Sequence, residues 1–182
     1  GLHITADMYT YPAGGTGLSA CMPPWIQEGG HEEFIARLKD PEIRKRLVTE
    51  MNTPTDAWEN MYLMSGSAEN VILSEFRSEA LRQFQGKTLA EVSKIRGTDP
   101  INTIIDLIIE DNSRVEAIYF TMTEENLERQ LQQPWVCIGS DASSQAPEGA
   151  FLKSRTHPRA YGTFARYLGK YVRERGLLPL EE

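Results

Sequence analysis

The order of apolar segments in the last third of the chain constrains the fold more than any other feature. Residues 115–120 and 135–139 are short apolar runs, which are typical of buried strands. A helical pattern over about 123–133 lies between them, and a polar loop over 141–158 leads to a final helix over about 160–175. Strands that alternate with helices in this way are typical of α/β proteins with a parallel sheet. The sequence therefore predicts an α/β fold.

A further strand is expected near the start of the chain. Residues 2–11 alternate and then become apolar and aromatic, as a short buried strand does. The proline and glycines of 12–17 are expected to end this strand in a hinge loop that allows close approach of another segment. In barrel enzymes, the loops that follow the strands hold the catalytic residues, so the end of this strand is of interest.

The middle of the chain shows the signals of helix starts. An aspartate followed by proline combines an N-cap with the residue preferred at the first helical position, and a threonine followed by glutamate three residues later is a capping box. These signals are Asp40-Pro41, Thr88 with Glu91, and Asp99-Pro100. After the last of them, isoleucines recur at the spacing of a core-facing stripe from Ile101 to Ile108. Residues 62–64 and 70–73 are expected to form two short strands around a turn.

Composition excludes several classes of protein. The chain has 182 residues, 40% hydrophobic and 25% charged, so we expect an ordinary globular protein with a core. The net charge of −7 disfavours a nucleic-acid partner. One basic run, 166–175, is expected to be a solvated helix face. No apolar run reaches the ~18 residues of a membrane helix, so no membrane partner is expected.

The two cysteines favour a reducing compartment and indicate no disulfide framework. Cys21 and Cys137 are far apart and outside any C-x-x-C spacing, so neither a zinc knuckle nor a disulfide framework is indicated. A reducing compartment fits this pattern, and we expect a cytoplasmic protein, with secretion left open.

Asp141 is the main candidate for catalysis. It follows directly on the predicted strand 135–139, so its carboxylate is expected at the carboxyl end of that strand, which is the catalytic face of a (β/α)8 barrel. A carboxylate beside a divalent metal can bind the ion and accept a proton from water. The alternative is an aspartate that caps a helix or forms an Asx turn.

Arg159 and Tyr9 are candidates for substrate binding. Arg159 lies where the long loop meets the last helix, and a guanidinium there can bind a carboxylate with two parallel hydrogen bonds. Tyr9, at the end of the first strand, has a phenol that can donate to the same carboxylate. The alternatives are a salt-bridging arginine and a tyrosine that packs in the core. His157 is interpreted as a structural residue beside Arg159. The histidines form no H-x-H or H-E-x-x-H pair, so the sequence does not encode a complete zinc site.

Three groups of residues now suggest a family. They are Asp7 through Thr16, then Gly86 through Glu91 with Asp99-Pro100, and Gly139-Ser140-Asp141 through Arg173. Together they resemble the C-terminal part of the D-aminoacylase family, the N-acyl-D-amino-acid deacylases of the amidohydrolase superfamily. The resemblance extends over nearly the whole chain, and its last part is the most specific.

The resemblance implies a zinc-dependent (β/α)8 barrel that hydrolyses the amide bond of an N-acyl-D-amino acid. It implies that Asp141 is the general base and touches the metal, and that Tyr9 and Arg159 hold the α-carboxylate of the substrate. A serine that the family often has six residues after the tyrosine is Gly15 here. Thr16 or Ser19 is a candidate to compensate for it.

The resemblance also implies that the chain is a fragment. The metal-binding histidines, cysteine and lysine of the family would lie upstream, so we expect zinc to be absent and the chain alone to be catalytically silent. Residues 1–12 are expected to be a barrel strand, 13–115 a largely helical insertion, and 116–182 the final strand–helix units of a partial (β/α)8 barrel. Unpaired strand edges in such a piece favour self-association.

Two alternatives remain open at this stage. A related fragment acting on a cyclic amide or ureido substrate would share the barrel chemistry. A non-catalytic interaction module would retain these residues as remnants. The joint presence of Asp141, Tyr9 and Arg159 favours the enzyme.

Overall fold

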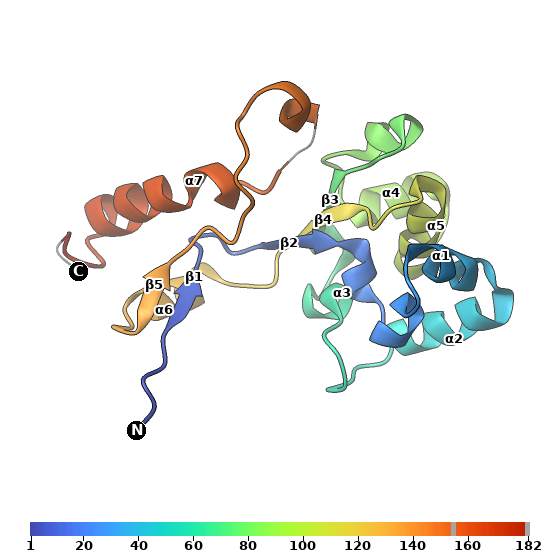
Figure 1. Cartoon of the computed structure of the whole chain (residues 1–182), viewed down its shortest axis with the longest axis horizontal. Helices are drawn as coiled ribbons and strands as arrows, with labels where there is room; N and C mark the ends of the chain where they lie inside the picture. Colours follow the sequence, from blue (N-terminus) through green and yellow to red (C-terminus); the bar gives the residue numbers. More distant parts are fainter. Residues whose placement is uncertain (154–155, 181–182) are drawn as a thin grey trace. The chain divides into compact units, whose positions relative to one another are not determined.

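The computed structural model describes residues 1–153 and 156–180, and the chain forms two compact units (Figure 1). Unit 1 comprises Gly1–Ala13 and Met122–Glu182, and unit 2 comprises Gly14–Thr121. Both units combine helices and strands, so the predicted α/β class is confirmed. The described strands form a two-stranded and a three-stranded sheet and no closed barrel. The partial barrel therefore stays a prediction.

Unit 1 is built on a pair of parallel strands. β1 (Ala6–Met8) pairs with β5 (Val136–Ile138), and the two lie side by side in Figure 1. Helix α6 (Glu124–Leu131) precedes β5, and its Thr123 N-cap accepts a hydrogen bond from the backbone N–H of Asn126. A 3-10 turn (Gly149–Lys153) follows β5 in the long connection. The parallel pairing agrees with the alternation of strands and helices in the sequence.

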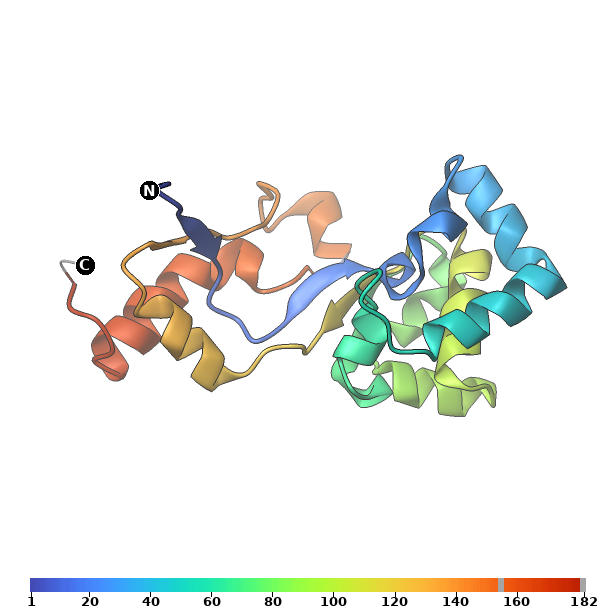
Figure 2. The ribbon, with the colours of Figure 1, turned by 90° about the horizontal axis from the view of Figure 1, so that it is seen from below.

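The last helix of unit 1 has two parts. Helix α7 (Arg159–Arg166) continues directly into a π-helical segment (Tyr167–Glu174), which Figure 2 shows from a second side. The predicted helix over about 160–175 is thus present. Tyr171, in the π-helical segment, is completely buried. The segment therefore contributes to the packing of unit 1 as well as to its surface.

Unit 2 is a three-stranded antiparallel sheet covered by helices. The strand order is β2 (Gly14–Gly17), β4 (Glu116–Tyr119) and β3 (Val71–Glu75). The helices are α1 (His31–Lys39), α2 (Pro41–Met51), α3 (Met61–Met64), α4 (Leu89–Arg96) and α5 (Pro100–Asp111). The isoleucine stripe of α5 is buried, with Ile104, Ile105 and Ile108 fully inaccessible. The unit also contains four short 3-10 helices: Leu18–Cys21, Pro24–Gln27, Ala68–Asn70 and Glu79–Phe84.

The helix starts of unit 2 agree with the sequence. The side chain of Asp40 accepts hydrogen bonds from two backbone N–H groups at the start of α2, and Asp99 caps α5 through Asn102. Thr88 and Glu91 form a complete capping box on α4, which ends at Gly97 in the left-handed conformation. Each of these signals acts within a few residues of its own position, which is why the sequence alone predicts it.

Two expectations about this unit are wrong. Residues 14–17 form a strand, because the backbone of Gly14–Gly17 pairs with β4. β4 belongs to unit 2, because it is hydrogen-bonded to both β2 and β3, and this unit ends at Thr121. Residues 62–64 are helical, because the side chain of Asn60 accepts hydrogen bonds from the N–H groups of Tyr62 and Leu63 and starts α3. The description of residues 13–115 as an insertion stays a prediction.

Replacing Asn60 by alanine is expected to lower the free energy of unfolding of unit 2 by about 1–2 kcal/mol, as for other lost N-caps. Asn60 is 5% exposed and also donates from Nδ2 to the carbonyl of Met51 at 2.9 Å, at the end of α2. Urea unfolding of both proteins measures the difference. Asn60→Ser keeps a capping oxygen, so its free energy of unfolding is expected to fall by less than that of Asn60→Ala. An equal decrease in both variants would contradict a capping role.

The described residues include no helix with the length and apolar character needed to cross a membrane.

Candidate functional site

The candidate site lies at the carboxyl edge of the β1–β5 pair. Met8 is paired with Ile138 at the last position of both strands, and the N–H of Gly139 donates to the carbonyl of Met8 at 3.0 Å. Tyr9 is the next residue after β1, and Asp141 follows β5 by three positions. The carboxyl ends of parallel strands meet at one edge of a sheet, which is where α/β proteins bind ligands. The register therefore places the two predicted residues at the same edge.

Asp141 has an unusual backbone conformation and an accessible carboxylate. Its φ is 48°, in the left-handed region that few residues other than glycine adopt, although aspartate is among those that tolerate it. The side chain is 73% exposed, and Oδ2 lies 3.0 Å from a guanidinium nitrogen of Arg159. The carboxylate is thus directed toward the arginine and remains open to solvent. Such conformations are often found at functional positions.

Arg159 connects Asp141 to Tyr9. It is the first residue of α7, and its side chain is only 13% exposed. Its guanidinium carbon lies 4.6 Å from the centre of the Tyr9 ring, within the range of a cation–π interaction. The structure therefore brings together all three residues that the sequence suggested for catalysis and substrate binding, within unit 1.

His157 contacts the same group of residues. Its Nε2 lies 2.9 Å from the carbonyl oxygen of Ala13, and its Nδ1 accepts the backbone N–H of Arg159 at 3.0 Å. Its ring meets the rings of Tyr9 and Tyr11 edge-on, with centres 6.0 and 5.6 Å apart. Burial lowers the pKa of His157 below its ordinary value, and the nearby positive charge of Arg159 lowers it further. The imidazole is therefore neutral at physiological pH.

A polar network supports the site from the side of α6. Glu124 accepts hydrogen bonds from the hydroxyl of Tyr171 at 2.6 Å and from Lys170, and lies 3.5 Å from Arg166. Arg166 also donates to the carbonyl of Thr10, directly after Tyr9, at 2.6 Å. The expectation of a solvated basic face is therefore wrong for Arg166 and Lys170. The reason is that Glu124, distant in sequence, supplies the opposite charge.

The residues considered as a replacement for the family's serine lie in unit 2. Gly15 is part of β2 and is paired with Ile118. The hydroxyl of Thr16 accepts a hydrogen bond from Arg114 at 3.2 Å, and Ser19 is buried in a 3-10 turn. Their proposed role in carboxylate binding stays a prediction.

The described residues lack the side-chain cluster that a metal site requires. Within them, no group of three or more histidine, cysteine, aspartate or glutamate side chains is placed to hold an ion. At the site itself, Asp141 supplies one carboxylate, and one of its oxygens is already paired with Arg159. A zinc site needs at least three protein ligands. The residues of this chain that the structure describes therefore do not fit a metal ion by themselves.

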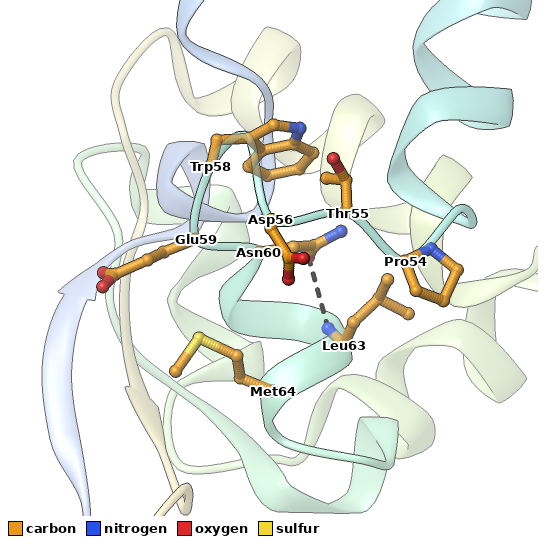
Figure 3. A pocket seen from close by; sticks show the side chains of 8 residues that line it. All are labelled: Pro54, Thr55, Asp56, Trp58, Glu59, Asn60, Leu63 and Met64. Carbon is orange, nitrogen blue, oxygen red and sulfur yellow. Dashed lines mark hydrogen bonds between the residues drawn. The ribbon is translucent and has the colours of Figure 1, made fainter.

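Unit 2 has a separate surface cavity of about 630 Å³ (Figure 3). Trp58, Leu63 and Met64 supply apolar walls, and Figure 3 shows Asp56 among them and the side chain of Glu59 directed outward. These two residues are the charged groups of the lining, and both are acidic. A cavity of this kind repels a carboxylate, because like charges raise the free energy of the bound state. The arginine-containing site in unit 1 is the better candidate for an anionic ligand.

Comparison with known proteins gives a consistent set of relatives. The chain is 37% identical to a D-aminoacylase of Alcaligenes xylosoxydans xylosoxydans over 99 residues, which is 54% of this chain and 18% of the relative. It is 38% identical to an N-acyl-D-glutamate deacylase of the same organism over 96 residues, 53% of this chain and 17% of the relative. The matches thus span less than a fifth of the length of these relatives. No family model matches the chain.

Solved structures show a similar fold. All of this chain matches 26% of the N-acyl-D-glutamate deacylase of Bordetella bronchiseptica, solved with zinc and a phosphonate mimic of the tetrahedral intermediate, with a TM-score of 0.59 and 23% identity. A D-aminoacylase whose structure defines a novel subset of amidohydrolases matches 97% of this chain over 26% of its own length, with a TM-score of 0.57 and 24% identity. The predicted similarity to the D-aminoacylase family is therefore confirmed, in sequence over about half of the chain and in fold over nearly all of it.

Proposed function

We propose that this chain supplies the substrate-carboxylate site and a catalytic carboxylate of a metal-dependent hydrolase that acts on N-acyl-D-amino acids. One observation supports this most strongly. Arg159, nearly buried, lies over the ring of Tyr9 and is paired with Asp141 at the carboxyl edge of β1 and β5. The curated relatives are acylases and deacylases of N-acyl-D-amino acids, so their names favour this substrate over a cyclic amide or ureido compound.

The arginine is suited to bind the α-carboxylate of the substrate. A guanidinium offers paired N–H donors in a plane that matches the two oxygens of a carboxylate. Little water reaches Arg159, so its charge is poorly screened and attracts an anion more strongly than a surface arginine does. The guanidinium carbon lies 4.6 Å from the centre of the Tyr9 ring, so a cation–π interaction with this ring helps to hold the guanidinium in place. In this proposal the Tyr9 hydroxyl donates a further bond to the same carboxylate.

Asp141 is suited to transfer a proton. Its side chain is 73% exposed, so a water molecule can reach the carboxylate. In the proposed reaction this carboxylate accepts a proton from the water that attacks the amide carbon, and then delivers a proton to the leaving amine. A metal contact of Asp141 is part of the proposal for the complete enzyme, with the other ligands supplied from outside the described residues.

The experiment that tests this function is a calorimetric titration of the chain with N-acetyl-D-alanine and with its carboxamide. The D-alanine derivative has the α-carboxylate as its sole anionic group, so the pair isolates that group. The carboxylate is expected to bind at least about tenfold more tightly, since one charged hydrogen bond contributes that much or more. Equal affinity for the two compounds, or no binding of the carboxylate, would rule out the proposed site.

A further inference from the structure

Both ring nitrogens of His157 are engaged with backbone groups from distant parts of unit 1. Nε2 lies 2.9 Å from the carbonyl oxygen of Ala13, which follows the β1 segment. Nδ1 lies 3.0 Å from the backbone nitrogen of Arg159, at the start of α7. The imidazole thus connects the start of α7 to Ala13, which is 144 residues from His157 in sequence.

These two partners determine the protonation state of the ring. A carbonyl oxygen can only accept a hydrogen bond, so Nε2 has to bear the hydrogen. A backbone N–H can only donate, so Nδ1 has to be unprotonated. The single form that satisfies both bonds is the neutral imidazole with its hydrogen on Nε2. A doubly protonated ring would direct a second N–H at the N–H of Arg159 and place a positive charge near the guanidinium.

The same ring packs against the residues that surround the guanidinium. It meets Tyr9 at an interplanar angle of 64° and Tyr11 at 90°. Tyr11 in turn lies so close to α7 that a Cβ atom on Gly162 would overlap its hydroxyl. His157 therefore fixes the backbone of Arg159 by a hydrogen bond and the ring of Tyr9 by packing. These are the two groups whose relative position defines the cation–π contact.

We propose that His157 is a positioning residue that holds Arg159 and Tyr9 in the geometry required for carboxylate binding, through the fixed Nε2-protonated tautomer. It acts through these two residues and does not touch the substrate. The expected effect of His157 on ligand binding rests on the proposed function. The arrangement of the free protein can be tested without any ligand.

The first test is made on the wild-type chain by nitrogen-15 NMR of the histidine side chains at neutral pH. His157 is expected to show a protonated Nε2 and an unprotonated Nδ1, in contrast to the tautomer mixture of a free imidazole. In the same spectra, the side-chain Nε–H proton of Arg159 is expected to be shifted by the ring of Tyr9. A protonated Nδ1, or a tautomer mixture at His157, would overturn the proposal even if every variant failed to fold.

The second test uses variants that separate the two roles of the ring. His157→Leu removes both hydrogen bonds, whereas His157→Asn retains a side-chain oxygen that can accept the N–H of Arg159. His31→Leu is the control, because it removes a histidine of unit 2 that contacts Asn112. The measured quantities are the Arg159 shift without ligand and the ratio of the dissociation constants for N-acetyl-D-alaninamide and N-acetyl-D-alanine.

His157→Leu is expected to abolish the Arg159 shift and to reduce the binding ratio at least about tenfold, since small misplacements of a binding group have effects of this size. In His157→Asn both the Arg159 shift and the binding ratio are expected to decrease less, and in His31→Leu both are expected to stay unchanged. A folded His157→Leu chain with an unchanged shift and an unchanged ratio would overturn the proposal. If the wild-type chain does not distinguish the two ligands, the proposed function fails, and the loss of the Arg159 shift still decides whether His157 positions the arginine.

Discussion

Replacing Arg159 by glutamine is expected to weaken the binding of N-acetyl-D-alanine at least about a hundredfold, because two charge-assisted hydrogen bonds are lost from a poorly hydrated site. The guanidinium is 13% exposed, so water replaces its contribution only in part. Binding of the carboxamide is expected to change little. Calorimetric titration of the wild-type chain and the variant with both ligands measures the two effects.

Arg129→Gln is the matched control for this prediction. It removes the same charge from the same unit, and the side chain of Arg129 is 74% exposed and paired with Glu125 in the preceding turn. The affinity of Arg159→Lys for N-acetyl-D-alanine should lie between those of the wild type and Arg159→Gln, since lysine keeps the charge but lacks the planar pair of donors. A similar loss of affinity in Arg129→Gln and Arg159→Gln would mean that net charge, and not this site, governs binding.

Replacing Glu124 by glutamine is expected to lower the free energy of unfolding of unit 1 by about 2–3 kcal/mol, somewhat less than the loss of a partner from a fully buried pair. The variant leaves Arg166 and Lys170 close together without the carboxylate between them. Burial by itself raises the pKa of Glu124, but hydrogen bonds from Lys170 and Tyr171 hold it below its ordinary value. This contribution to stability is present above the ordinary carboxyl pKa and is lost as the pH falls through the lower, folded-state value.

Urea unfolding of the wild type and the Glu124→Gln variant, at neutral pH and below the folded-state pKa of Glu124, measures both effects. The difference between the two proteins is expected to shrink at the acidic pH, where the wild-type carboxylate is protonated as well. Glu125→Gln is the control, because this neighbouring side chain is 75% exposed. A stability difference that does not depend on pH would show that the charge of Glu124 is not the cause.

The parts of the fold that the sequence predicts are those decided by nearby residues. The capping box of Thr88 and the N-caps of Asp40 and Asp99 act within one helical turn, so their signals are complete in a short stretch. β2 could not be predicted in this way. Its glycine-rich sequence is typical of a loop, and it becomes a strand because β4, about a hundred residues later, supplies the hydrogen-bonding partner.

The candidate site also combines features that the sequence predicts with contacts between residues that are distant in sequence. Asp141 and Arg159 were predicted from their places at a strand end and a helix start, together with the family resemblance. The sequence suggests a structural role for His157 beside Arg159, but it does not reveal the partners, because only the folded chain brings the carbonyl of Ala13 and the rings of Tyr9 and Tyr11 to this side chain. The arrangement of the Glu124 network was missed for the same reason, since a run of basic residues does not reveal a distant acidic partner.

The most direct test of the central claim is a crystal structure of this chain grown with N-acetyl-D-alanine. The account predicts that the α-carboxylate lies within about 3 Å of the Arg159 guanidinium, the distance of a charge-assisted hydrogen bond, with the Tyr9 hydroxyl as a second donor. A ligand bound in the cavity of unit 2 beside Asp56 and Glu59, with no contact between the ligand and Arg159, would contradict it.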